Sequence, residues 1–116
     1  MNWLDPFFLI VGAVAMTLVI VGGVLLRFPP RQINPMFGYR TPTSMRSQAR
    51  WDFAQRYSAR LFVQAGLIGA AVSLVGVVVN WSVTTAGIAA TLAVVAMVGL
   101  PIVMTEWALR KRFRDQ

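Results

Sequence analysis

The sequence predicts an all-α membrane protein with three transmembrane helices, the second of which is extended by a cytoplasmic amphipathic helix. The composition is 57% hydrophobic and 13% charged, whereas soluble domains are about 45–50% apolar and about 25% charged. Three long apolar runs cover residues 7–26, 61–79 and 83–105. The 116 residues are therefore predicted to form a single three-helix membrane domain, with a loop at 27–60 and a tail at 106–116.

The first apolar run, residues 7–26, contains no charged side chain. Its length suffices to cross about 30 Å of hydrocarbon at about 1.5 Å per residue. Asp5 and Pro6 favour a helix start, because an acidic N-cap followed by proline suits the first turn. Arg27 and the prolines after it favour a stop. A cleaved signal peptide is the alternative, but it needs a basic segment before a shorter apolar run.

The second and third runs are separated by a short predicted turn at residues 80–82. The alternating pattern of barrel strands is absent, so backbone groups within the bilayer must be satisfied by helices. Pro101 lies within the third run and predicts a kink, unless neighbouring groups satisfy the carbonyl that it frees. No ionisable residue lies in the middle of a run, which argues against a pump or an antiporter.

The basic residues predict the orientation of the chain in the membrane. Residues 1–6 and 80–82 carry no lysine or arginine. The 11 basic residues all lie in the loop and the tail: Arg27, Arg31, Arg40, Arg46, Arg50, Arg56, Arg60, Arg110, Lys111, Arg112 and Arg114. The positive-inside rule then places loop and tail in the cytoplasm and the amino terminus outside, in the inner (plasma) membrane. These bases are explained as topology determinants, so no nucleic-acid partner is expected.

The segment 44–60 contains neither glycine nor proline and predicts a helix that begins near Ser44 and continues into the second span. Hydroxyls of the preceding threonines and of Ser44 are candidate N-caps. Four arginines, Arg46, Arg50, Arg56 and Arg60, fall on one side of this helix at 100° per residue, and Asp52 is spaced to pair with Arg56. The basic side either meets anionic lipid headgroups or forms a specific site for an anion or a partner peptide.

Enzymatic chemistry finds little support in the composition. The chain has no cysteine and no histidine, and its four acids are scattered. No catalytic site, metal site or cofactor is therefore predicted.

Small residues recur at four-residue spacing, as in Gly66/Ala70 and Ala86/Ala90, which lets helices approach closely. Packing among the three helices is favoured over a homo-oligomer interface as the reason for this spacing.

A motif in the loop resembles the SdpI immunity-protein family. Residues 34–45 read NPMFGYRTPTSM, and Trp51 and the pair Gln55–Arg56 follow. In that family a Gly-x-Arg-Thr-Pro stretch precedes a tryptophan and an asparagine–arginine pair, between two membrane spans. Gln55 stands where the family has asparagine. The resemblance implies a non-enzymatic bacterial membrane protein that protects the cell against a secreted toxic peptide, or holds a cytoplasmic regulator at the membrane.

The candidate binding residues are Gly38, Tyr39, Arg40, Thr41, Pro42, Trp51, Gln55 and Arg56. Gly38 permits a tight turn, from which Arg40 points toward whatever the loop encloses. Two interpretations of Arg40 stay open: it binds a partner, or it only ties the loop to a helix carbonyl or to Glu106. The other basic residues are expected to contact headgroups. The alternative function is binding of anionic lipid headgroups, or transport of a lipid or small solute.

Overall fold

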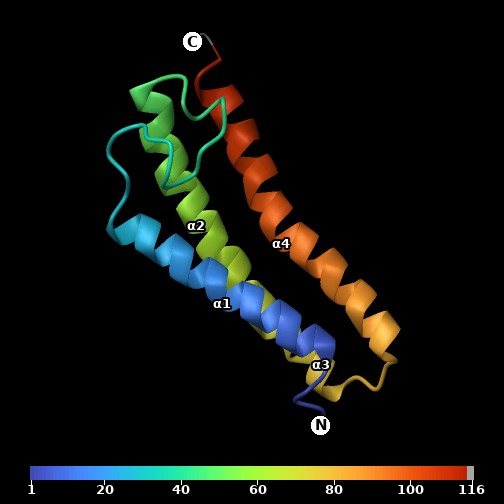
Figure 1. Cartoon of the computed structure of the whole chain (residues 1–116). Coiled ribbons are helices and arrows are strands. Elements are labelled where there is room, and N and C mark those ends of the chain that lie inside the picture. Colours follow the sequence, from blue (N-terminus) through green and yellow to red (C-terminus); the bar gives the residue numbers. More distant parts are fainter. Residues whose placement is uncertain (115–116) are drawn as a thin grey trace.

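The computed structural model describes residues 1–114 and contains four helices, α1 (Pro6–Arg27), α2 (Gln48–Ser73), α3 (Val75–Val78) and α4 (Val83–Arg112). This part of the chain contains no strand. The molecule is elongated, with extents of 51 × 25 × 20 Å, and the three long helices run side by side (Figure 1). Three helical stretches, Pro6–Arg27, Gln48–Val78 and Val83–Arg112, are long and apolar enough to cross a membrane. The predicted all-α, three-span class is confirmed.

Asp5 fixes the start of α1 and also joins it to the connection before α4. Its Oδ2 accepts a hydrogen bond from the backbone N–H of Phe8 at 3.1 Å, which is the predicted N-cap. Its Oδ1 accepts a bond from Trp81 Nε1 at 2.7 Å. The Phe7 and Trp81 rings then meet edge-on, with centroids 5.1 Å apart. One carboxylate therefore holds both the helix start and the connection at residues 79–82.

Replacement of Asp5 by alanine is expected to destabilise this end of the molecule by about 2 kcal/mol, because one N-cap bond and one bond to the half-buried Trp81 indole are lost together. Asp5→Asn retains an oxygen acceptor and is expected to lose less than half as much. Thermal unfolding of the purified protein in detergent measures both. Equal losses in the two variants would contradict the dual role of the carboxylate.

The prediction that the second helix begins near Ser44 is wrong. α2 begins at Gln48, because Ser47 is the N-cap and its Oγ accepts from the N–H of Arg50 at 3.1 Å. The amphipathic extension is not confirmed as predicted either. Arg46 precedes the helix, and Arg50 is buried at 3% exposure instead of facing outward. A further break at Leu74, whose N–H bonds Ala71 and Val72 carbonyls, separates α2 from α3.

Glycine allows α1 and α2 to pack closely. A Cβ on Gly22 would lie 2.8 Å from the carbonyl oxygen of Ala59, and one on Gly66 would lie 2.7 Å from that of Ala15. No side chain fits at these distances, so the two backbones pack directly against each other. The small residues Ala86 and Ala90 of α4 are fully buried in the core that contains Phe7 and Val11. These small residues therefore serve packing within the chain.

The last helix is longer than its apolar run. α4 begins after Ser82, whose Oγ accepts from the N–H of Thr85 at 3.1 Å, and it remains helical across Pro101. It continues beyond Thr105 to Arg112, so most of the predicted tail is helix; residues 115–116 of that tail lie outside the described part. This extension reaches the loop between α1 and α2 at one end of the molecule (Figure 1).

Candidate functional site

All basic residues of the described part gather at one end of the molecule, which we call the basic end and define by residues 27–60 and 106–114. The ends of α1 and α4 and the start of α2 meet there, together with the loop of residues 28–47 (Figure 1). The opposite end holds residues 1–5 and 79–82, which carry no basic side chain. The charge asymmetry of the sequence is thus an asymmetry between the two ends of the fold.

Gly38 forms a turn that no other residue fits. Its φ is +102°, a conformation that side chains with a Cβ rarely adopt. A Cβ there would lie 2.6 Å from Gln55 Oε1 and 2.7 Å from Pro30 Cγ. The preceding residues also turn, because Asn34 Oδ1 accepts from the N–H groups of Met36 and Phe37. The loop is therefore bent sharply and brought against α2.

Gln55 bonds both backbone groups of Tyr39. Its Oε1 accepts from the Tyr39 N–H at 2.7 Å, and its Nε2 donates to the Tyr39 carbonyl at 2.8 Å. Gln55 is 1% exposed. A buried amide satisfied on both sides by one residue fixes that residue in position and orientation. This pair joins the loop to α2 across 16 residues of sequence.

Thr41 and Ser44 cap each other. The Thr41 N–H donates to Ser44 Oγ at 2.9 Å, and the Ser44 N–H donates to Thr41 Oγ1 at 3.1 Å. Both hydroxyls are thereby used within one isolated turn, which explains why neither of them caps α2. Pro42 lies exposed within this turn. The predicted helix restart at Thr41–Pro42 is a single turn, and the true restart follows at Ser47.

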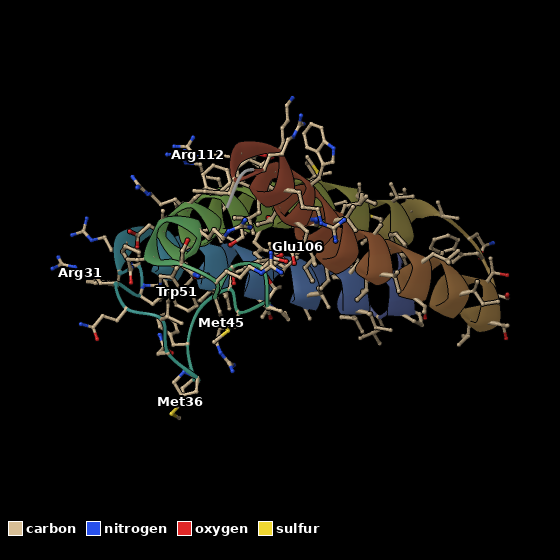
Figure 2. The ribbon with its side chains drawn as sticks, turned by 90° about the horizontal axis from the view of Figure 1, so that it is seen from above. Arg31, Met36, Met45, Trp51, Glu106 and Arg112 are labelled. Carbon is tan, nitrogen blue, oxygen red and sulfur yellow. The ribbon has the colours of Figure 1, made fainter. Side chains whose placement is uncertain are left out.

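Trp51 fastens the first part of the loop. Its indole is fully buried, and Nε1 donates to the carbonyl oxygen of Pro30 at 2.7 Å. Gln48, one turn earlier on α2, donates to the carbonyl of Arg31. The two side chains hold the chain where it leaves α1 and enters the loop. The tryptophan of the motif therefore supports the start of the loop, and Figure 2 labels it beside the loop.

The Tyr39 side chain enters the space between the loop and α4. It is 7% exposed, and its Oη lies 3.3 Å from the carbonyl oxygen of Ile102, to which it donates. Burial raises the pKa of the Tyr39 phenol well above its ordinary value, and the nearby negative charge of Glu106 raises it further. Glu106 Oε2 is buried and has no hydrogen-bond partner in the described part. Tyr39, and not Arg40, is thus the loop residue that approaches Glu106.

This raised pKa predicts how stability depends on alkaline pH. Above the ordinary tyrosine pKa of about 10, the unfolded chain loses a proton that folded Tyr39 retains. The free energy of unfolding is therefore expected to be greatest below pH about 10 and to fall above it. Tyr39→Phe removes this contribution. The free energy of unfolding of both proteins is measured by denaturation between pH 8 and 11, in steps of about one pH unit. The two curves of unfolding free energy against pH should diverge above pH about 10, and parallel curves would contradict the assignment.

Arg40 lies between two fixed residues and points outward. It is exposed, and it makes no hydrogen bond or ion pair within residues 1–114. Its neighbours Tyr39 and Thr41 are held by Gln55 and Ser44. The structure therefore brings together Gly38, Tyr39, Thr41, Trp51 and Gln55 as the support of the loop. Arg40 bonds neither a helix carbonyl nor Glu106 within residues 1–114, so the interpretation that it only ties the loop in place is wrong.

Several arginines behave differently from the sequence-based expectation. Arg50 is buried, donates from Nη2 to the Phe113 carbonyl at 2.8 Å and stacks over the Phe113 ring at 5.3 Å, so it joins α2 to the end of α4. Asp52 accepts from Gln48 Nε2 at 2.8 Å and forms no ion pair with Arg56. Arg56 is exposed on α2, away from the Gln55 side that holds the loop. Pro30, Ser44 and Glu106 complete the site. Nothing in the local sequence marks Pro30. From the sequence, Glu106 is a possible partner of Arg40, but Tyr39 approaches it instead.

The fold and its basic end define a small multi-pass membrane protein whose ordered loop packs against its helix ends. Residues 31–105 match the model of the SdpI/YfhL protein family, a stretch that includes most of the loop and the second span. The chain belongs to the SdpI/YfhL family, which is not a known enzyme family.

One relative gives a measure of the similarity. The chain is 45% identical over 64 residues to the uncharacterized protein YfhL of Bacillus subtilis (strain 168), a match that covers 54% of this chain and 58% of that protein. The matched part is thus less than two thirds of the relative's length. No solved structure matches the chain.

Proposed function

We propose that the chain is a non-enzymatic bacterial inner-membrane protein of SdpI type, which acts in immunity to a toxic peptide, in membrane sequestration of a cytoplasmic regulator, or in both. Membership of the family supports this proposal, because the matched residues 31–105 include the Gly38–Pro42 turn and its supports on α2. The amino terminus lies outside and the basic end lies in the cytoplasm under the positive-inside rule.

The observation that carries the proposal is the placement of Arg40. Four hydrogen bonds hold the backbone directly before and after it, two from the Gln55 amide to Tyr39 and two between the Ser44 hydroxyl and the N–H and carbonyl of Thr41. Its guanidinium is nevertheless exposed. A guanidinium whose backbone is already ordered loses little further freedom on binding and offers a fork that matches a carboxylate. This arrangement suits recognition of an acidic group on another protein.

The location of the turn favours a cytoplasmic partner for this loop. Arg40 lies at the basic end, outside the three apolar spans, so a soluble regulator reaches it without entering the bilayer. Protection against a toxic peptide rests on the family resemblance. The two roles are compatible, since occupancy of the membrane part by a peptide can alter the loop that packs on the ends of α2 and α4.

Arg40→Lys is expected to abolish the phenotype while topology and abundance persist, because lysine cannot reproduce the paired hydrogen bonds of a guanidinium. Arg46→Lys is the matched control: Arg46 is exposed in the same loop and follows the same turn, and lysine preserves its charge. The measurement is survival under toxic peptide and membrane retention of a regulator, with membrane abundance determined by immunoblot. Equal behaviour of the two variants would overturn the role of Arg40.

A further inference from the structure

A second basic feature lies on the other side of the helix ends from the loop. A recess of about 340 Å³ lies between α2 and the end of α4. Figure 2 places Arg112, one of its lining residues, on the opposite side of the helices from Met36 of the loop. The recess is therefore separate from the Arg40 turn. Its lining residues from α2 include Asp52, Phe53, Arg56, Tyr57 and Arg60.

Three guanidinium groups line this recess, and none of them has a carboxylate partner within residues 1–114. Arg56 and Arg60 are exposed, one turn apart on α2, and Arg112 faces them from α4. The single acid, Asp52, is engaged by Gln48 Nε2 at 2.8 Å. Like charges at this spacing repel by about 0.2–0.5 kcal/mol on a helix. Uncompensated clustering of positive charge in a concavity favours a bound anion.

Aromatic rings shape one wall of the recess and hold Arg112. Its guanidinium carbon lies 5.0 Å from the centroid of Phe53 and 5.8 Å from that of Phe113. The Phe53 and Tyr57 rings are stacked with centroids 5.2 Å apart. Contact with aromatic faces positions a guanidinium without consuming its N–H donors in ion pairs. Arg112 is therefore oriented and still able to donate to an anion.

The depth of the recess selects the kind of anion. Arg60 is the last charged residue of α2 before the uncharged run 61–79, and this run begins the part that is apolar enough to span a membrane. The recess thus lies where the hydrocarbon gives way to the headgroup layer. Anions concentrated at this depth are the phosphates of lipids, whose glycerol and acyl parts fit an aromatic and apolar wall.

We propose that Arg56, Arg60 and Arg112 form a binding site for the phosphomonoester headgroup of an anionic lipid. Three guanidinium groups and one carboxylate give the recess a formal charge of +2, which a phosphomonoester of nearly two negative charges matches better than a singly charged diester. The forks of Arg56 and Arg60 donate to different phosphate oxygens. The site is independent of the Arg40 turn and of the proposed immunity or sequestration role.

The test uses the purified full-length chain and nanodiscs of phosphatidylcholine that contain phosphatidic acid, phosphatidylglycerol or neither, with bound lipid measured by native mass spectrometry. Arg56→Gln/Arg60→Gln is compared with Arg31→Gln/Arg46→Gln. The second pair removes the same charge from exposed positions outside the recess. We expect retention of phosphatidic acid to fall at least tenfold in the first pair and less than twofold in the second.

Three outcomes would overturn the site. Equal losses in both double variants would mean that general positive charge attracts the lipid. Equal retention of phosphatidic acid and phosphatidylglycerol by the unaltered chain would exclude selection of a phosphomonoester. Displacement of phosphatidic acid by inorganic phosphate at equal concentration would identify a site for free phosphate. Helix content by circular dichroism verifies the fold of each variant, and Arg112→Lys, which keeps the charge, should lose the selectivity but not the fold.

Discussion

Gln55→Ala is expected to release the loop of residues 28–47 from α2 and to lower the free energy of unfolding by about 3 kcal/mol. The substitution removes the hydrogen-bond partner of the buried Tyr39 N–H and one of the donors to the Tyr39 carbonyl. Each loss costs about 1–3 kcal/mol. A void also replaces the side chain. Thermal unfolding in detergent measures the loss, and trypsin cleavage after Arg31, Arg40 and Arg46 measures the release of the loop.

Gln64→Ala is the matched control for this prediction. Gln64 lies on the same helix but is exposed, so its loss should change stability by less than about 0.5 kcal/mol. Gln55→Asn tests whether the length of the side chain matters. Asparagine carries the same amide on a shorter side chain, and without a shift of the loop it cannot bond both backbone groups of Tyr39. If Gln55→Ala and Gln64→Ala unfold and digest alike, Gln55 does not hold the loop.

Gly22→Ala is expected to destabilise the packing of α1 on α2, whereas Gly23→Ala is expected to be neutral. A Cβ on Gly22 would lie 2.8 Å from the Ala59 carbonyl oxygen and 3.0 Å from the Val63 backbone nitrogen, so the helices must separate. Such overpacking costs about 1–3 kcal/mol. A Cβ on Gly23 meets no atom within 4 Å. The difference in unfolding temperature between these adjacent substitutions measures the effect.

The matched design removes general effects of the substitution, because both positions lie in the same turn of the same helix and receive the same methyl group. A larger change, Gly22→Val, should lose more than Gly22→Ala. A smaller loss in Gly22→Ala than in Gly23→Ala would contradict the direct backbone approach of the two helices, and would indicate that α1 and α2 are separated by side chains near their basic ends.

The elements with local causes could be predicted from the sequence. Apolar runs long enough for a bilayer identify the three spans, and Asp5 with Pro6 identifies the start of α1. Gly38 could be recognised as a turn, because glycine within a proline-rich stretch signals one, and its φ of +102° confirms the turn. These features depend on neighbours along the chain, and the sequence displays such neighbours directly.

The parts that could not be predicted depend on distant residues. In the sequence, Thr41 and Ser44 resemble helix caps, but in the structure they bond each other. Ser47, whose hydroxyl is not used in that turn, caps α2 instead. Arg50 shares a helical face with other arginines in projection. The end of α4, 63 residues away, covers it and accepts its hydrogen bond. Local periodicity carries no information about which face a later helix will cover.

The motif residues show the same division. Their resemblance to a family signature pointed to a segment that lies within the matched residues 31–105, but it did not indicate the structural role of each member. Trp51 and Gln55 were candidates for binding, and both are buried supports that bond the loop backbone. Glu106 is reached by the ring of Tyr39, although Arg40 carries the opposite charge. The burial of a side chain in a loop is decided by the surface on which the loop packs.

The central claim, that a fixed loop at a cytoplasmic basic end presents Arg40 outward, is tested most directly by single-cysteine labelling. The chain has no cysteine of its own, so Arg40→Cys, Ser44→Cys and Ser82→Cys each introduce one thiol. A membrane-impermeant maleimide is applied to right-side-out and inside-out vesicles. We expect Arg40→Cys to be labelled rapidly, and only in inside-out vesicles. Ser44→Cys should be labelled slowly, because its position is fully buried. Ser82→Cys should be labelled only in right-side-out vesicles. Equal rates at positions 40 and 44, or labelling of Arg40→Cys from outside, would contradict the claim.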